Sequence, residues 1–319
     1  MSTVLRRFIV VLTILLLLSV RAQTANPPNY PTKPIELKYY APGPWAVVIK
    51  KGAACCDSTG KKFDLYYPKH LGANGFQHPV LTWGNGSFAK PSRYKYFLAH
   101  MASWGFVVIA TEDENTGPGQ TVLDGAIYLI NANSTPASVF YHKLNIVQIG
   151  AFGHSQGATG AFNAMLKSGG KIKTVVPIEL PAQFLCTNPA NCADTTKMSS
   201  GSIFLIDGSA DLIISPPTQF PWETGEQSVA AYYDGVPAGV LKVKGTLIGP
   251  NHNDIQGQPS CQPISWPCTN GVYGYLGYPT AWMMAQLQGD NYARGAFVNG
   301  SGEIFSETTN WELAASDVP

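Results

Sequence analysis

Charged side chains are scarce in this chain. Asp, Glu, Lys and Arg together make up 13% of its 319 residues, and the formal net charge is +1. Proteins that bind nucleic acid neutralise phosphates with clustered Lys and Arg, so the lack of a basic cluster argues against a nucleic-acid partner. Because 45% of the residues are hydrophobic, intrinsic disorder is excluded as well. With 32 Gly and 24 Pro to interrupt helices, a long coiled coil is also excluded.

The chain also has little that could cross a membrane. Its longest apolar run, residues 8–20, spans 13 positions, whereas a spanning helix needs about 20. Arg6 and Arg7 precede this run and Val20-Arg21-Ala22 follows it, which is typical of a secretory signal peptide cleaved after Ala22. We therefore expect a secreted protein, extracellular or periplasmic, with no stable membrane anchor after cleavage.

The six cysteines lack the two-residue spacing of a zinc knuckle, and no histidine lies near them. We expect no metal, and the even count fits disulfides in an oxidising compartment. Cys186 with Cys192, and Cys261 with Cys268, would each close a short loop. Adjacent cysteines pair with each other only under strain, so the partners of Cys55 and Cys56 stay open.

Strand and helix patterns alternate along the chain. Apolar runs typical of buried strands occur at residues 80–83, 106–110, 146–152, 174–178, 202–206 and 241–248. Apolar residues at helical spacing lie between several of these runs. The alternation predicts an α/β fold with a mostly parallel central sheet and helices on both faces. The expected organisation is a signal at 1–22, a Pro-rich linker at 23–34, a single domain at 35–312 and a tail at 313–319.

The motif Gly153-His154-Ser155-Gln156-Gly157 joins one of these strands to an Ala-rich helix. A serine in such a G-x-S-x-G turn has its hydroxyl thrust outward, and flanking glycines let strand and helix approach closely. The N-terminus of the helix offers N–H groups and a positive dipole end, which suit a developing oxyanion. Ser155 is therefore predicted to be a nucleophile.

A serine hydroxyl needs a base to take its proton. In this kind of strand–turn–helix motif the order along the chain is Ser, acid, His, and of the six histidines only His252 follows Ser155. It comes directly after the run at 241–248, at the edge where the serine emerges. We interpret the other five as structural: His100 at a surface-facing helix position, His70 and His78 in polar loops, His142 without a role, and His154 within the motif itself.

The acid must lie between Ser155 and His252 in sequence. Asp211, in the turn after the run at 202–206, meets this order and is the predicted partner of the imidazole. Two alternatives exist: Asp207, which ends the same run, and Glu179, which ends the run before it.

An oxyanion hole needs two backbone N–H groups. Gln156, after the nucleophile, is predicted to provide one, and Asn85, in the Gly84–Ser87 loop after an earlier strand, the other. Asn85, Asn133 and Asn299 also begin N-x-[ST] glycosylation sequons. Because a glycan would block an oxyanion loop, we favour the catalytic interpretation of Asn85.

These motifs resemble the α/β-hydrolase superfamily and, within it, the branch of cutinase-like polyester hydrolases, chlorophyllase-like proteins and platelet-activating-factor acetylhydrolases. The resemblance is carried by residues 79–86, 98–108, 153–157, 207–211, 251–252 and 280–290. It implies a secreted serine carboxylic-ester hydrolase that acts on a small-molecule or polymeric ester, without a metal or organic cofactor. A peptidase or amidase on the same fold, and a non-catalytic binding protein, are the alternatives.

The chain departs from that branch in two places. Esterases of the branch that act on aromatic polymers have an aromatic residue before the nucleophile and another after the next strand, where this chain has His154 and Ala182. The segment 261–278 is long and rich in aromatics, among them Trp266 and Tyr273. It either borders the substrate pocket or is a surface loop held by a disulfide.

Overall fold

A computed structural model describes residues 26–257 and 268–319. Nine strands form one sheet in the order β1-β2-β4-β3-β5-β6-β7-β8-β9. Their bounds are β1 Val47–Cys55, β2 Lys62–Pro68, β3 His78–Gly84, β4 Val107–Thr111, β5 Leu144–His154, β6 Ile172–Ile178, β7 Ser202–Gly208, β8 Leu241–Leu247 and β9 Trp311–Ser316. The six strands from β3 to β8 pair in parallel, and β1, β2 and β9 are antiparallel to their neighbours.

This mostly parallel sheet confirms the predicted fold class, and each of the six predicted apolar runs lies in one of its parallel strands, to within one residue at the ends of the run. β3, β4 and β7 are buried along their whole length, which explains why most of their residues are apolar and do not alternate with polar ones. Ends of consecutive parallel strands lie at one edge, and that edge carries the loops that contain Ser155, Asp211 and His252.

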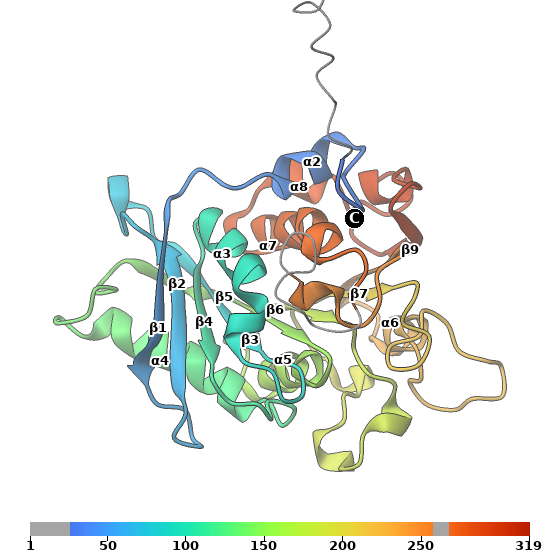
Figure 1. The fold of residues 1–319 in the computed structure, drawn as a ribbon, viewed down its shortest axis with the longest axis horizontal. Coiled ribbons are helices and arrows are strands. Elements are labelled where there is room, and N and C mark those ends of the chain that lie inside the picture. The colour runs from blue at the N-terminus through green and yellow to red at the C-terminus, as the bar shows by residue number, and fades with distance from the viewer. Residues whose placement is uncertain (1–25, 258–267) are drawn as a thin grey trace, which may run out of the picture.

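Helices cover both faces of the sheet (Figure 1). On one face, α3 packs on β2 and β4, α7 packs on β5 and β6, and α2 and α8 pack on α7; on the other face, α4, α5 and α6 lie against the parallel strands. Their bounds are α2 Pro34–Tyr40, α3 Lys95–Ser103, α4 Gln120–Ser134, α5 Gln156–Lys167, α6 Val229–Gly235, α7 Gly277–Gln288 and α8 Asn291–Arg294. Two separate buried apolar clusters, one on each face, form the core.

Short 3-10 helices lie in the connections. Their bounds are η1 Ala73–Gly75, η2 Pro91–Tyr94, η3 Gln183–Leu185, η4 Pro189–Asn191, η5 Thr195–Lys197, η6 Asp254–Gln256, η8 Val272–Tyr275 and η9 Glu303–Phe305. None of the helices within the described parts of the chain is both long enough and apolar enough for a membrane span.

Both ends of the predicted domain differ from the expectation. The predicted tail 313–319 includes most of β9, which pairs with β8, and Val318 is buried. Part of the predicted linker is also bound to the domain, because the Asn29 side chain donates to the Ile248 carbonyl at 2.9 Å. Neither segment has the long apolar pattern of a core strand, so only its tertiary partners define it as part of the domain. The predicted signal peptide lies outside the described residues.

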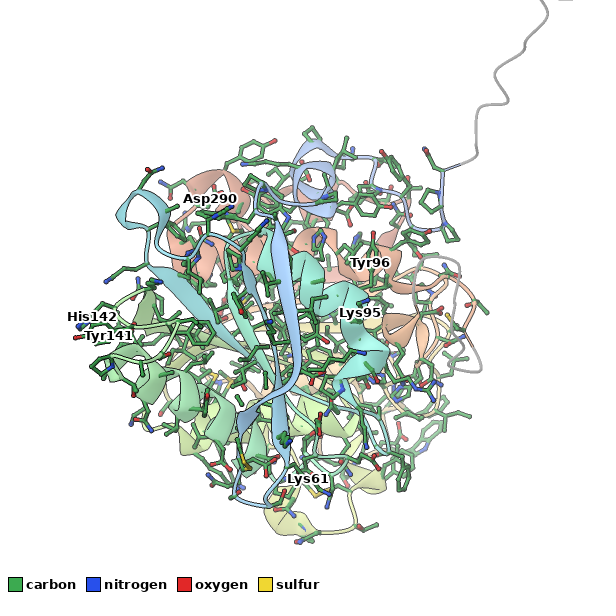
Figure 2. The ribbon with its side chains drawn as sticks, turned by 60° about the vertical axis from the view of Figure 1, so that its left-hand side comes forward. Lys61, Lys95, Tyr96, Tyr141, His142 and Asp290 are labelled. Carbon is green, nitrogen blue, oxygen red and sulfur yellow. A yellow bond between two sulfur atoms is a disulfide. The ribbon has the colours of Figure 1, made fainter. Side chains whose placement is uncertain are left out.

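The antiparallel edge formed by β1 and β2 ends in a tight turn. Figure 2 shows this pair with Lys61 in the turn and with Lys95 and Tyr96 at the start of α3. Asp57 holds the turn by accepting the N–H groups of Thr59 and Lys61, each at 2.9 Å. Cys55 and Cys56 form a vicinal disulfide beside it, across a cis peptide bond.

Candidate active site

Ser155 lies in a strained turn between β5 and α5. Its φ of 55° and ψ of −127° are rare for a residue with a side chain. The turn is possible because Gly153 and Gly157 are in close backbone contact, with no room for a Cβ on either, and Gly157 is equally close to Gly84 on β3. Substitution of these glycines would push the strand and the helix apart, which is the physical reason for the G-x-S-x-G pattern.

The hydroxyl of Ser155 meets the predicted base. Ser155 Oγ lies 2.8 Å from His252 Nε2, and His252 Nδ1 lies 2.6 Å from Asp211 Oδ2. The three residues come from three loops at the same edge of the sheet. Ser155 and His252 are 97 positions apart in the sequence. Two hydrogen bonds therefore join a hydroxyl, an imidazole and a carboxylate in one line.

Asp211 is buried, 4% exposed, in an environment that keeps it charged. Burial alone would raise the pKa of its carboxyl, but the hydrogen bond and charge of His252, followed by the backbone N–H of Ile214, lower that pKa below its ordinary value. The N–H groups of Ile214 and Ser215 bind its two oxygens at 3.1 and 3.2 Å. The carboxylate is thus held in place to orient the imidazole.

The two alternative acids are also buried, but neither bonds to His252 directly. Asp207 accepts the hydroxyl of Thr246 at 2.7 Å, and burial, with the nearby charge of Asp211, raises the pKa of Asp207 to about 7. Glu179 accepts the phenol hydroxyl of Tyr275. Geometry therefore assigns the imidazole partner to Asp211.

His154 was interpreted as structural, and the structure gives its partners, which the sequence did not predict. Its ring is buried, with Nδ1 2.9 Å from the hydroxyl of Tyr94 and Nε2 2.7 Å from the carbonyl of His252. Tyr94 in turn accepts the N–H of Gly86 at 3.0 Å. This chain of hydrogen bonds links the Gly84–Ser87 loop to the backbone of His252. Because the ring faces inward, it offers no platform on which a substrate ring could stack.

Two other histidines correct the sequence interpretation. His100 was expected at the surface but is buried between α3 and α2, where Nε2 donates to the Tyr39 carbonyl at 2.9 Å and burial lowers its pKa to about 4. His78 was expected in a polar loop but begins β3 in full burial, which lowers its pKa. In each case a backbone carbonyl fixes a neutral imidazole inside the core.

The predicted oxyanion residues lie on either side of Ser155. Gln156 follows it as the first residue of α5 and lines the cavity described below. Asn85 is fully buried. Its side-chain amide nitrogen donates to the carbonyls of Thr111 and Asp113 at 2.6 and 2.9 Å. Ser87, two residues further on, faces the cavity. Asn85 therefore shapes the loop, and its role as N–H donor stays a prediction.

The buried side chain of Asn85 argues against glycosylation at that residue. Asn133 is 8% exposed and its side-chain oxygen accepts the N–H of Leu144 at 2.9 Å. Asn299 is exposed. Of the three sequons, that at Asn299 is therefore the one a glycosylating enzyme could reach.

A cavity of about 530 Å³ opens beside Ser155. Apolar side chains and small polar ones line it, and none of the lining residues is charged: Ser87, Asn115, Gly117, Pro118, Ser155, Gln156, Thr159, Pro181, Leu185, Cys186, Thr187, Asn188, Asn191, Ala193, Ile214 and Tyr232. The disulfide between Cys186 and Cys192, as predicted, closes the loop that forms one wall. A neutral group of moderate size fits this lining.

In the described part of the aromatic segment, residues 268–278, the tyrosines do not border the cavity. Tyr275 and Tyr278 are fully buried in the core, and Tyr273 lies near Tyr40 and Tyr96. None of these three tyrosines lines the cavity. Asp254 holds the start of the described part by accepting the N–H groups of Thr269, Asn270 and Gly271. Cys261 and Trp266 lie outside the described residues.

Among the described residues, Glu179, Asp211 and His252 have potential metal-ligand atoms within 4.8 Å of one another. His252 Nδ1 and Asp211 Oδ2 already bind each other, so a cation there would have to break the triad. The arrangement fits proton transfer better than metal binding.

The contact between Glu179 and Tyr275 is a feature of the site that the sequence did not predict. The two residues are 96 positions apart. The one sign of it in the sequence was that an acidic residue, Glu179, follows the apolar run at 174–178.

The mostly parallel sheet is compatible with an α/β-hydrolase-like fold. No protein-family model matches the chain, and comparison with curated proteins also found no match.

Proposed function

We propose that this protein is a serine hydrolase of carboxylic esters. The observation that carries the proposal is the line of hydrogen bonds from Ser155 Oγ through the His252 ring to Asp211, at 2.8 and 2.6 Å. A hydroxyl that can pass its proton to an oriented imidazole is an activated nucleophile. The strained turn that presents Ser155 and the adjacent cavity are further support.

The reaction follows from these positions. As His252 Nε2 takes the proton of Ser155, the serine oxygen attacks the ester carbonyl carbon and its π electrons move onto the carbonyl oxygen. The N–H groups of Gln156 and of the Gly84–Ser87 loop, with Asn85 the predicted donor, stabilise this oxyanion. Collapse of the tetrahedral intermediate breaks the bond to the alcohol oxygen, which receives the proton from His252 and leaves an acyl-enzyme. Water, deprotonated by His252, then releases the acid and restores Ser155.

The cavity lining favours a neutral acyl or alcohol group, because burying a charge without a partner is costly. Whether the natural ester is a small molecule or a polymer is part of the same proposal and needs a substrate panel. We further propose that the protein is exported through its N-terminal signal, which agrees with the disulfide at Cys186 and Cys192.

Replacement of the nucleophile tests the proposal. We expect Ser155→Ala to lower the turnover of p-nitrophenyl butyrate by roughly 10⁴–10⁶-fold, with unchanged thermal unfolding because Ser155 is a partly exposed turn residue. Ser134→Ala, at the exposed end of α4, is the matched control and should keep full turnover. Near-normal turnover by folded Ser155→Ala would refute the assignment.

Two further measurements separate the alternatives. A fluorophosphonate probe should label wild-type protein and not Ser155→Ala; a wild-type protein that resists the probe would favour a non-catalytic binding protein. A peptidase or amidase would release p-nitroaniline from anilides of the same acyl groups well above the uncatalysed rate, whereas we expect this protein to cleave the esters and leave the anilides at the background rate.

A further inference from the structure

Glu179 occupies a position that packing alone does not explain. It follows β6 directly, is fully buried, and has a φ of 52°, a left-handed conformation that is unfavourable for a residue with a side chain. Its N–H donates to the carbonyl of Ile206 on β7 at 2.8 Å. Strain of this kind persists where the surrounding structure holds the residue in place.

The carboxyl of Glu179 has two different surroundings. Oε1 accepts the hydroxyl of Tyr275, whereas Oε2 is buried without a hydrogen-bond partner. Potential ligand atoms of Glu179, Asp211 and His252 lie within 4.8 Å of one another. Asp211 already accepts hydrogen bonds from His252, Ile214 and Ser215. If Glu179 and Asp211 were both ionised at this short separation, the two carboxylates would repel each other. A proton shared between them lowers the energy.

Electrostatics favour Glu179 as the residue that carries the proton. Burial, followed by the charges of Asp211 and Asp207, raises the pKa of Glu179 well above its ordinary value, whereas the pKa of Asp211 is lowered. The titratable groups around this carboxyl are Asp207 on β7, Asp211 after it, His252 after β8, Asp254 on η6 and Tyr275 on η8.

We propose that Glu179 is a positioning residue, a protonated carboxyl whose Oε2–H donates to Asp211 and thereby keeps a single negative charge under the catalytic imidazole. Tyr275 then donates to Glu179, and Glu179 donates to Asp211, which also accepts the Nδ1–H of His252. Asp211 is the common acceptor, and no buried oxygen of Glu179 lacks a partner. This inference rests on the proposed function, because it gives the triad a fourth member.

A pair of substitutions tests the role in turnover. Glu179→Leu removes the donor and should lower kcat by roughly 10–100-fold with little change in KM, as loss of a supporting hydrogen bond does. Glu179→Gln is neutral and keeps an N–H donor of similar shape, so it should restore most of that turnover. A glutamine variant as poor as the leucine variant would overturn the proposal, and so would a leucine variant as active as wild type.

A second measurement locates the proton without relying on turnover. We would follow the His252 imidazole by NMR across the pH range in wild-type protein and in Glu179→Gln. If Glu179 is protonated, glutamine removes no charge and the midpoint of the His252 titration stays the same. If Glu179 is ionised, its replacement removes a negative charge beside the imidazolium, and the midpoint moves to lower pH, which would overturn the proposal.

The two hypotheses can fail separately. If wild-type protein cleaves no ester, the esterase function is refuted. If the midpoint of the His252 titration is nevertheless the same in Glu179→Gln as in wild type, the proton on Glu179 still stands. Thermal unfolding of each variant shows whether it folds; if Glu179→Leu does not, the NMR comparison alone decides where the proton lies.

Discussion

Two groups of acidic side chains are gathered in this protein, and they behave differently. The active-site carboxyls are Glu179, Asp207 and Asp211; the terminal carboxyls are Glu36 on α2, Glu303 on η9 and the nearby Glu307. In both groups burial raises the pKa of at least one member well above its ordinary value. They differ in the groups that form hydrogen bonds with these carboxyls.

Backbone and indole donors surround the terminal carboxyls. Glu303 accepts the N–H groups of Ile35 and Glu36, each at 2.8 Å, and Glu36 accepts the indole N–H of Trp311 at 2.7 Å. These bonds join the start of the described chain to its end. Among the carboxyls of the candidate site, by contrast, Asp211 binds the imidazole of His252, whose other ring nitrogen lies 2.8 Å from the Ser155 hydroxyl. Burial of acids is common to both groups, and a hydrogen bond to a histidine distinguishes the first group.

The largest effect that separates the groups should come from Asp211→Asn. It leaves the shape of the site intact but takes away the charge that orients and stabilises the imidazole, so we expect turnover to fall by roughly 10³–10⁴-fold. Asp207→Asn is the matched control in the same group, because Asp207 makes its hydrogen bond to Thr246 and not to His252. A comparable loss in Asp207→Asn would mean that the acid has been assigned to the wrong residue.

Substitution of Glu36 should affect stability without affecting catalysis. Glu36→Ala leaves the indole N–H of Trp311 without its buried partner, and we expect the free energy of unfolding to fall by about 1–3 kcal/mol. Glu36→Gln keeps an acceptor and should recover most of this loss in urea unfolding. Turnover per folded molecule should stay the same in both. A drop in turnover of folded Glu36→Ala would show that the two groups are coupled.

The smallest expected effect is a change in the pH dependence of stability. The pKa of Asp207 is raised to about 7 by burial, whereas an unfolded chain releases this proton near pH ~4. The folded state therefore binds the proton more tightly, so this contribution to stability is complete below about pH 4 and is lost as the pH rises towards 7. Other buried acids with raised pKa values, such as Glu226, act in the same direction.

Asp207→Asn removes this contribution. Between about pH 5 and pH 8, the free energy of unfolding of the variant should therefore fall less than that of wild-type protein. Glu312→Gln, exposed on β9, serves as the control and should keep the wild-type slope. An equal slope in Asp207→Asn and wild type would contradict a proton on Asp207.

Local patterns predicted the parts of this protein that depend on neighbours in sequence. Gly153-His154-Ser155-Gln156-Gly157 implied a strand, a tight turn and a helix, because glycine at both flanks is required wherever strand and helix nearly touch. Apolar runs implied buried parallel strands for the same kind of reason, since a strand covered on both faces has no solvent-facing side. Chain order then singled out His252 and Asp211 as candidates.

Tertiary structure decided what depends on distant partners. The strand that begins at Trp311 pairs with β8, 64 or more positions away in the chain, and its short mixed pattern carries no sign of this. His100 is buried because α2 covers it, not because of its place on α3. Glu179 meets Tyr275 and Asp211 only when three loops converge at one sheet edge. Spacing along a chain specifies local geometry, whereas the protonation of a buried carboxyl depends on which charges and donors the folded chain brings within a few ångströms of it.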